Sequence, residues 1–326
     1  MTDVQAPPVP QARPVPVPER ESVIEVRGLR MSYGSYDAVR DIDLQVHRGE
    51  VFAFLGPNGA GKTTTVEILE GLRTRTGGEV RVLGEDPQRG SAAWRSRIGV
   101  VLQESEPERD LTVRECLRLF AGYYPAPRGV DETIELVGLT DKRDAIAGRM
   151  SGGQRRRLDV ALALIGDPEL VFLDEPTTGF DPNARRAAWE MIAGLRDLGV
   201  TVFLTTHYMD EAEFLADRLA VLARGKIVAE GTPATLGGRQ NAAAQISFTL
   251  PAQATADELP GEVREALVAV EPRVRLQTPS LLSVLRPLVA WAEKRGFDLA
   301  DLDVRRPSLE DIYIELTASE ATGRQS

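Results

Sequence analysis

The chain alternates between short apolar runs and longer stretches in which apolar residues recur every three or four positions. Short apolar runs bounded by turn residues are typical of buried strands, and the longer stretches are typical of helices that cover a sheet. The pattern predicts a helix over residues 63–72. It predicts strands over residues 23–26, 42–46, 51–55, 80–83, 98–102, 170–173 and 200–204. Strands and helices in this alternation predict an α/β fold, with helices on both faces of a sheet.

The pattern changes again near residue 237. A hairpin is predicted over residues 219–229, with Arg224 and Gly225 in its turn. Residues 237–241, Gly-Gly-Arg-Gln-Asn, then resemble a linker. Beyond it we predict helical stretches between three strands, at residues 245–250, 281–285 and 302–305, and a last helix that starts with the capping pair Ser308 and Asp311. These elements predict a small α+β domain over residues 242–318.

The two ends of the chain differ from the rest. Residues 1–21 contain six prolines, which remove backbone donors and favour an extended, solvated chain. We therefore predict a disordered tail over residues 1–21, a large α/β domain over residues 22–236, and a second disordered tail over residues 319–326.

Composition narrows the function classes. The 326 residues carry 39 basic and 49 acidic side chains, and the net charge of −10 argues against a nucleic-acid partner. A single cysteine, Cys116, and two histidines argue against disulfide or zinc frameworks, and we interpret Cys116 as a core residue. No apolar run is long enough to span a bilayer, and no signal peptide is visible. We therefore expect a cytosolic chain that reaches a membrane only through a partner.

The most specific motif lies between the strand at 51–55 and the helix at 63–72. It contains Gly56, Pro57, Asn58, Gly59, Ala60, Gly61, Lys62 and Thr63, which together satisfy GxxxxGK[ST]. The glycines let the backbone approach phosphates closely, and the helix N-terminus directs its free N–H groups at the anion. Lys62 can reach the outer phosphates, the Thr63 hydroxyl can bind Mg²⁺, and Thr64 completes the phosphate-binding set. Such a loop predicts nucleotide binding without specifying the reaction.

Two further segments add chemistry to this loop. The apolar strand at 170–173 ends in Asp174 and Glu175, which are placed to hold Mg²⁺ and to polarise an attacking water, respectively. The segment Ser151, Gly152, Gly153 and Gln154 predicts a helix N-terminus that can approach a phosphate.

Together these motifs resemble the ATP-binding subunits of ABC transporters, over about residues 23–236. The segment Met150–Gln154 departs from the usual LSGGQ motif only in its first residue. The resemblance implies that Gln103 senses Mg²⁺ and the membrane partner, that Asp181 belongs to the D-loop, and that His207 is the switch histidine. It also implies an aromatic that stacks on adenine. Tyr33 is favoured for that role, and Tyr36 competes for it.

The resemblance implies a P-loop NTPase fold of the ABC type, with a mixed sheet core, an antiparallel β subdomain and a helical subdomain. It implies that ATP and Mg²⁺ are the cofactors. It also implies a head-to-tail dimer, in which Ser151–Gln154 and Asp181 of one copy complete the nucleotide site of the other. Catalysis would then involve Glu175, His207, Gln103 and Lys62, and the metal site would involve Thr63, Gln103 and Asp174.

Residues 64–72 and 307–313 further resemble the drug-export subfamily typified by daunorubicin-resistance ATPases. That resemblance implies an exporter whose permease is a separate integral-membrane protein, with this chain at the cytoplasmic face of the membrane. The alternative is a soluble ABC ATPase that acts on a ribosome or a DNA-repair complex. Only one P-loop is present, and 112 positions separate Lys62 from Asp174, which argues against both alternatives.

Overall fold

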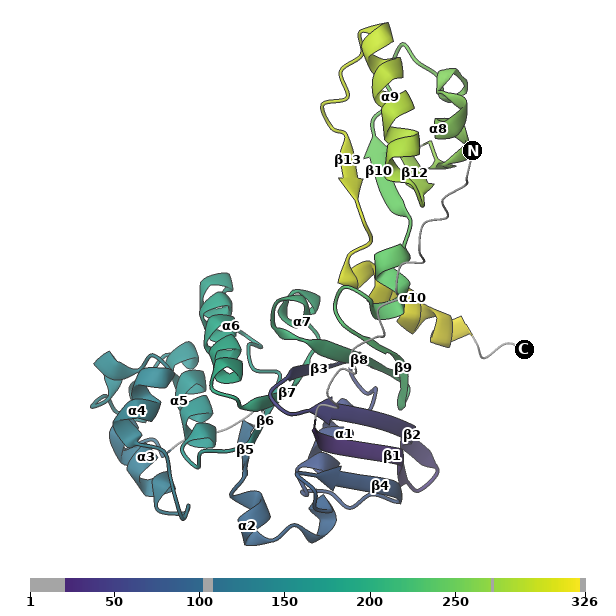
Figure 1. Ribbon diagram of the computed structural model, residues 1–326. Helices are drawn as coiled ribbons and strands as arrows, with labels where there is room; N and C mark the ends of the chain where they lie inside the picture. The colour runs from purple at the N-terminus through teal and green to yellow at the C-terminus, as the bar shows by residue number, and fades with distance from the viewer. Residues whose placement is uncertain (1–20, 102–107, 271–272, 323–326) are drawn as a thin grey trace, which may run out of the picture.

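The structure is a computed structural model that describes residues 21–101, 108–270 and 273–322, with side chains to residue 318. A six-stranded sheet, in the order β5-β6-β7-β3-β8-β9, lies at the centre of the larger part of the molecule (Figure 1). Neighbouring strands are parallel except for β8 and β9, which form the predicted hairpin. The strands are β5 (Ile98–Val101), β6 (Leu170–Asp174), β7 (Thr201–Thr206), β3 (Val51–Leu55), β8 (Arg218–Ala223) and β9 (Lys226–Gly231).

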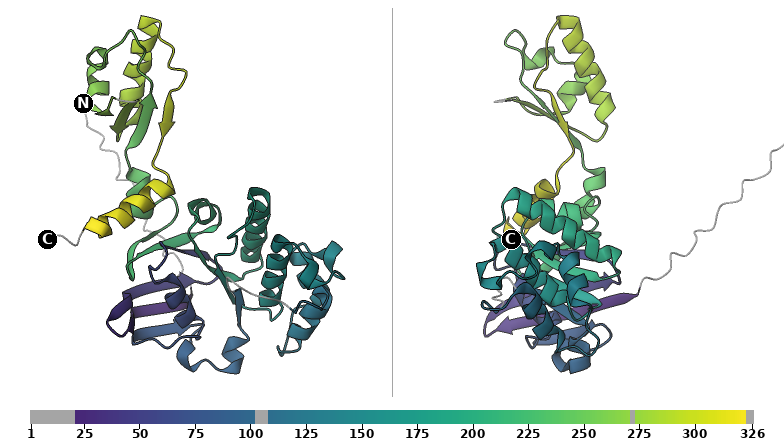
Figure 2. Two further views of the ribbon diagram at one scale, coloured as in Figure 1. Left: turned by 180° about the vertical axis from the view of Figure 1, so that it is seen from behind. Right: turned by 90° about the vertical axis from the view of Figure 1, so that its left-hand side faces the viewer.

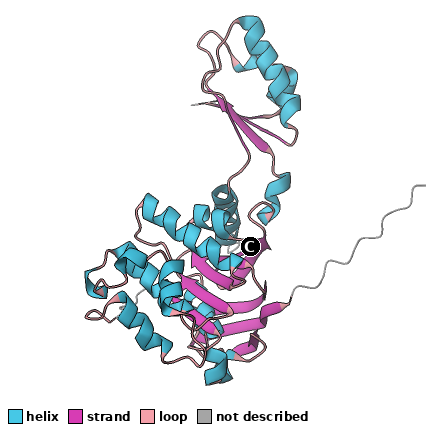
Figure 3. Cartoon of the chain, turned by 60° about the vertical axis from the view of Figure 1, so that its left-hand side comes forward, coloured by secondary structure: helices cyan, strands magenta, loops and turns pink. Residues whose placement is uncertain are grey.

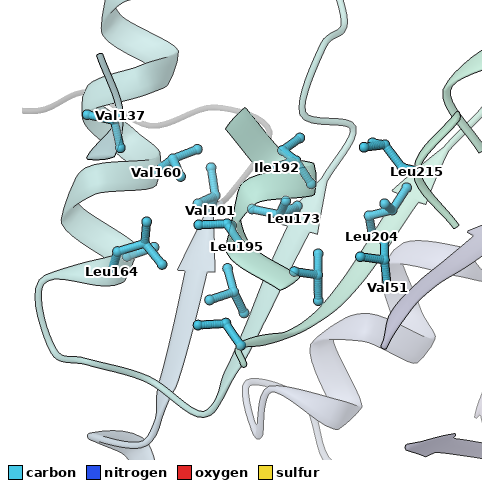
Figure 4. Packing of buried hydrophobic residues seen from close by; sticks show 14 of the residues in the cluster. Val51, Val101, Val137, Val160, Leu164, Leu173, Ile192, Leu195, Leu204 and Leu215 are labelled. Carbon is cyan, nitrogen blue, oxygen red and sulfur yellow. The ribbon is translucent and has the colours of Figure 1, made fainter. Parts of the chain in front are cut away.

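Helices cover one face of this sheet. Alternate residues of β3, such as Val51 and Leu55, share a buried cluster with α5 (Gly152–Leu164) and α6 (Pro182–Asp197). Figure 4 shows Leu173 and Leu204 of the strands facing helix residues that include Val160, Leu164, Ile192 and Leu195. Because side chains alternate along a strand, the other residues of β3 point to the opposite face.

The opposite face packs on a three-stranded antiparallel sheet, in the order β2-β1-β4, and on α1 (Lys62–Leu69). Its strands are β1 (Ser22–Tyr33), β2 (Tyr36–His47) and β4 (Gly77–Val82). Phe52 and Phe172 place their ring centroids 5.7 and 5.6 Å from that of Phe203. The central strands are therefore buried on both faces, which explains their continuous apolar sequence.

A group of helices extends from the β5 edge of the sheet. It contains α3 (Val113–Ala121), α4 (Val130–Leu136) and α5, while α2 (Ala92–Arg95) precedes β5 and α7 (Met209–Leu215) follows β7. Thr112 and Glu115 form a reciprocal capping box at the start of α3, and Cys116 on the same helix is fully buried, in agreement with its interpretation as a core residue. The predicted fold class is confirmed by this combination of mixed sheet, antiparallel sheet and helices.

A second, smaller sheet forms after residue 243, in the order β11-β12-β10-β13 (Figure 2). Its elements are β10 (Ala244–Phe248), α8 (Gly261–Glu265), β11 (Leu267–Ala269), β12 (Val274–Thr278), α9 (Leu281–Arg295) and β13 (Asp303–Arg305). Ile246, Phe248 and Leu276 pack with Val284 and Leu288 of α9 in a separate cluster. The sheet thus has its own core, and α9 covers one of its faces (Figure 3).

The predicted strand at residues 281–285 is wrong, because these residues form the first turns of α9. A short apolar run fits either element. Val284, Leu288 and Ala292 are buried while Arg286 and Ala290 between them are exposed, which fits a helix and excludes the period of two of a strand. The strands β11 and β12 lie in a stretch that the sequence analysis describes as helical. In β12 the buried residues alternate with exposed ones, Arg275 and Gln277, a period of two.

The last helix, α10 (Leu309–Thr322), returns to the larger part of the molecule (Figure 1). Ser308 and Asp311 form the predicted capping pair, since Ser308 Oγ accepts from Asp311 N at 3.0 Å and Asp311 Oδ2 accepts from Ser308 N at 2.8 Å. Leu309 and Ile312 are buried in the same cluster as β3 and α5. Most of α10 lies within residues 242–318, the range predicted for the small domain. It nevertheless packs against α7, β8 and β9 of the larger part of the molecule.

The junction between the two parts is the 3₁₀ helix η4 (Leu236–Asn241), which includes the predicted linker. Gly237 has a φ of +56°, and a Cβ at this position would lie 2.6 Å from Ile312 Cγ2. Among the described residues, no helix is long and apolar enough to cross a membrane. The proline-rich segment at residues 1–20 and residues 323–326 lie outside the described residues.

We expect Leu288→Ala to destabilise the small domain by about 2–5 kcal/mol, because Leu288 is fully buried and its removal leaves a cavity. The matched control is Leu282→Ala on the same helix, where the side chain is 60% exposed and the cost should stay within about 0.5 kcal/mol. Urea denaturation, monitored through the amide exchange of the β10 residues, measures the loss of stability in both variants. Equal loss in the two variants would contradict a separate core in this domain.

Candidate functional site

The phosphate-binding loop has the context that its sequence predicts. It leaves the end of β3 and enters α1 at Lys62. Gly61 has a φ of +105°, and a Cβ there would lie 2.4 Å from the carbonyl oxygen of Ala38. A Cβ on Gly56 would lie 2.5 Å from the carbonyl oxygen of Leu222. Both positions therefore require glycine, and the loop can fold only as a tight turn against β2 and β8.

Lys62 lies inside this loop. Its Nζ donates to the carbonyl oxygens of Gly56 at 2.7 Å and Pro57 at 3.3 Å. Burial lowers the pKa of Lys62, and the nearby Glu175 and Asp174 act in the opposite direction. The ammonium group is thus held where a bound anion could approach it. Thr63 is exposed and Thr64 half-buried, both in the first turn of the helix.

Asp174 and Glu175 lie at the end of β6, as the sequence predicts. The Thr205 hydroxyl of β7 donates to Asp174 Oδ1 in a short contact, and Glu175 N donates to Thr205 Oγ1 at 3.1 Å. Glu175 has a φ of +45°, a left-handed conformation that non-glycine residues rarely adopt. Strained backbone of this kind persists where neighbouring contacts fix it.

The Glu175 side chain contacts two further residues. His207, just after β7, has its Nδ1 3.2 Å from Glu175 Oε1, and the Thr178 hydroxyl donates to Glu175 Oε2 at 3.1 Å. The carboxylate is largely buried, whereas the His207 side chain is partly exposed. The structure therefore brings together two of the predicted catalytic residues, one from each of two adjacent strands.

Arg156 is a site residue that the sequence analysis does not single out. It extends from α5 and donates to the carbonyl oxygens of Asp174 at 2.7 Å and Pro176 at 3.2 Å. Burial lowers the pKa of its guanidinium group. Only the position of Arg156 on the helix that follows Ser151 hints at such a role. The contact fixes the backbone on which Glu175 sits.

Ser151 forms the N-cap of α5. Its Oγ accepts from Gln154 N at 3.3 Å, and Gln154 Oε1 accepts from Ser151 N at 3.1 Å. The predicted helix start is therefore confirmed, with Gly152 and Gly153 in its first turn. In the described part of the chain, none of the hydrogen bonds of these four residues reaches the phosphate-binding loop.

Asp181 is the N-cap of α6, where its Oδ1 accepts from Asn183 N and Ala184 N at 3.0 and 2.9 Å. Tyr33 and Tyr36 face one another across the β1–β2 turn. Both are exposed, at 42% and 55%, so exposure does not separate the two candidates for base stacking. The Arg73 guanidinium lies 5.4 Å from the Tyr33 ring centre, and Tyr36 Oη lies 3.5 Å from the Gly59 carbonyl oxygen. Gln103 lies outside the described residues.

The donor set fits Mg²⁺. Asp174 supplies a carboxylate and Thr63 a hydroxyl, and hard oxygen donors are what this ion prefers. Among the described residues, no group of three or more histidine, cysteine or acidic side chains could form a complete metal cage. Mg²⁺ usually keeps water and phosphate oxygens and takes only one or two protein ligands, so the sparse set agrees with a metal–nucleotide complex.

Glu70, at the end of α1, is a second site neighbour that the sequence analysis does not single out. The side chain is buried, and burial raises the pKa of Glu70 to about 8, with Asp174 and Glu67 acting in the same direction. The carboxyl group is therefore neutral in the folded chain at pH values where an exposed glutamate is ionised.

Comparison with known proteins matches residues 39–178 to the ABC transporter family. It also matches residues 244–308 to a family described as the C-terminal domain of ABC transporter domain-containing proteins. The chain is 40% identical over 318 residues to the Nod factor export ATP-binding protein I of Cupriavidus pinatubonensis, covering 95% of both chains. It is 36% identical to the daunorubicin resistance ATP-binding protein DrrA3 of Streptomyces coeruleorubidus, covering 92% of this chain and 97% of that one.

Solved structures give the same result for the larger part of the molecule. The protein cbiO1 of Clostridium perfringens, described as part of the ABC transporter complex cbiONQ, is 25% identical, with a TM-score of 0.60. The match covers 65% of this chain and 89% of that chain.

We expect Glu70→Gln to raise the free energy of unfolding more at pH 8.5 than at pH 5.5. The folded chain keeps Glu70 protonated up to about pH 8, whereas the unfolded chain releases this proton above about 4.5. Between the two pKa values, the free energy of unfolding of the wild-type chain therefore falls by ~1.4 kcal/mol per pH unit as the pH rises. The Glu70→Gln variant has no proton to release here and does not show this fall. Urea denaturation at the two pH values measures the difference. The same gain at both would contradict the raised pKa.

Proposed function

Because this chain belongs to the ABC transporter family of ATPases, we propose that two copies bind ATP–Mg²⁺ at their interface and hydrolyse it to drive a separate permease. The proposal depends above all on one observation. Glu175 is held at the end of β6, with His207 Nδ1 3.2 Å from its carboxylate, at the edge of the sheet where the phosphate-binding loop begins. That edge is where α/β sheets bind ligands.

In this proposal Glu175 polarises the attacking water and His207 stabilises the charge that develops at the γ-phosphate. Lys62 and the backbone N–H groups of residues 56–64, except Pro57, which has none, bind the phosphates. The bonds from Thr205, Thr178 and Arg156 support this assignment, because they fix the backbone and carboxylate of Glu175 before any ligand is bound. Preorganised groups of this kind avoid the cost of reorganisation during the reaction.

Thr63 and Asp174 are the proposed ligands of Mg²⁺, together with Gln103, which lies outside the described residues. When bound, the ion neutralises charge on the β- and γ-phosphates. The contact between Asp174 and the Thr205 hydroxyl orients the carboxylate toward this task. Tyr33 is the proposed stacking partner of the adenine ring.

The second copy has a defined task in the proposal. Ser151 and Gln154 cap this helix N-terminus, and the N–H groups of Gly152 and Gly153 take no part in that cap, an arrangement that suits a γ-phosphate. Within one chain these residues make no hydrogen bond to the phosphate-binding loop, among the residues described. A head-to-tail partner would bring its own Ser151–Gln154 and Asp181 against that loop, and hydrolysis would weaken the contact and open the dimer.

Export through a separate membrane protein is supported by the relatives. Two proteins that match over more than nine-tenths of this chain are described as export and drug-resistance ATP-binding proteins, and cbiO1 is described as part of a transporter complex. We therefore propose a peripheral position on the cytoplasmic face of the membrane and a drug or other hydrophobic small molecule as cargo. The alternative function is action on a ribosome or a DNA-repair complex. None of these three proteins is described in that way.

We expect Glu175→Gln to retain ATP binding and to slow turnover at least about 10²-fold, because the amide cannot accept a proton from water. A matched control is Glu190→Gln, in which an exposed carboxylate on α6 is replaced. Phosphate release and binding of a fluorescent ATP analogue measure the two quantities. Turnover at the wild-type rate in Glu175→Gln would remove Glu175 from the proposed role.

We also expect activity to reappear when two inactive variants are mixed. Lys62→Ala disables the phosphate-binding loop of its own subunit, and Ser151→Arg disables the site of the partner. A dimer of one copy of each keeps one intact site, whereas both homodimers keep none. ATP hydrolysis is measured after differently tagged subunits are co-purified. Mixed dimers that form and stay inactive would contradict shared sites.

A further inference from the structure

Glu211 is a buried acid to which the proposed mechanism assigns no role. It lies in the first turn of α7, and its side chain is fully buried, with 0% exposure. Its Oε1 accepts two hydrogen bonds, from the Thr177 hydroxyl at 2.7 Å and from Trp189 Nε1 at 2.9 Å. Its other oxygen, Oε2, is buried with no hydrogen-bond partner among the described residues, and a buried polar atom without a partner costs stability.

The two donors come from segments that carry the proposed site. Thr177 follows Glu175 by two residues, in the loop whose next residue, Thr178, donates to the Glu175 carboxylate. Trp189 belongs to α6, the helix that Asp181 caps. The helix of Glu211 itself begins two residues after His207. One oxygen atom therefore joins the loop after β6, helix α6 and the segment that follows β7.

We propose that Glu211 is a positioning residue that holds Glu175 and His207 in register, an inference that rests on the proposed function. Its Oε1 fixes Thr177, and through it the turn on which Glu175 sits. Glu211 lies in the first turn of α7, directly after the His207 segment, so the same residue also fixes that segment. The 3.2 Å approach of Glu175 to His207 then depends on one carboxylate that touches neither residue.

The backbone of Glu175 explains why such a contact is needed. Its φ of +45° is unfavourable for a residue with a Cβ, and it persists only if the residues on both sides are fixed. Arg156 and Thr205 hold the chain at residues 174–176. Glu211 holds it at residue 177, on the C-terminal side. Without this contact the turn can relax, and a shift of about 1 Å at a reacting group can cost 10²-fold in rate.

The protonation of Glu211 does not decide the proposal. Burial raises the pKa of this carboxyl group, while the surrounding hydroxyl and indole donors favour its ionised form. In either form Oε1 can accept from both Thr177 and Trp189. The carbonyl oxygen of a glutamine can accept the same two bonds. Glutamine should therefore preserve the positioning, and alanine should remove it.

The test compares Glu211→Ala, Glu211→Gln and Glu175→Gln in the purified full chain. We expect Glu211→Ala to lower kcat at least about 10-fold with a KM for ATP within about twofold of the wild type, because Tyr33 and the phosphate-binding loop are unaffected. Glu211→Gln should keep kcat within about threefold. Glu213→Ala is the matched control on the same helix, since it removes only an exposed ion pair with Arg239.

If Glu211 only keeps the chain folded, Glu211→Ala lowers the amount of folded protein and leaves kcat per folded molecule unchanged. Rates are therefore normalised to the fraction of protein that binds a fluorescent ATP analogue, so that loss of folded protein does not count as loss of turnover. Wild-type kcat in the folded fraction of Glu211→Ala would overturn the inference. A Glu211→Gln variant as slow as Glu211→Ala would do so too, because the acceptor atom would then be irrelevant.

Thr177→Val keeps the inference testable if Glu211→Ala does not fold. This nearly isosteric change removes one donor, and we expect it to lower kcat several-fold; an unchanged kcat would overturn the inference. Glu175→Gln distinguishes a failure of the role of Glu211 from a failure of the proposed function. If Glu175→Gln is inactive while Thr177→Val and Glu211→Ala are normal, only the role of Glu211 fails. If Glu175→Gln is fully active, the proposed function fails as well.

Discussion

The parallel pairing of β6 with β7 is the constraint on which the site depends. In this register Asp174 lies beside Thr205, so one hydroxyl bonds to Asp174 and accepts from the backbone of Glu175. β3 pairs with the other side of β7, which brings the start of the phosphate-binding loop to the same edge. A slip of one residue would turn every side chain of β6 to the opposite face of the sheet. The three aromatic rings and the aliphatic clusters on the two faces oppose such a slip.

Local sequence predicts those parts of the site whose chemistry is local. The loop at residues 56–63 is recognisable because glycine, lysine and threonine are needed at fixed spacing. The caps at Ser151 and Ser308 are recognisable because both partners lie within one turn. Arg156, Thr205 and Glu211 could not be found in this way, since their partners are 18 to 34 residues distant in sequence. The strand wrongly predicted at residues 281–285 shows the same limit, because five apolar-rich residues do not determine a period.

Buried ionisable groups surround the site on several sides. Lys62, Glu70 and Glu211 are buried and Arg156 is half-buried. Burial lowers the pKa of the two basic groups and raises the pKa of the two acids, and both shifts favour the neutral form. A nucleotide-binding site gains from this arrangement, because charges interact more strongly where water is scarce.

The return of α10 has a consequence for how the molecule is made. Leu309 and Ile312 complete a cluster whose other members come mostly from residues 51–236, and the small sheet is synthesised between the two. On the ribosome, most of the larger core therefore emerges well before the residues that close it. The growing chain has to wait for about seventy further residues, at roughly 5–20 residues per second. Until residues 309–312 have been made, the apolar side chains that Leu309 and Ile312 cover have no partner from α10.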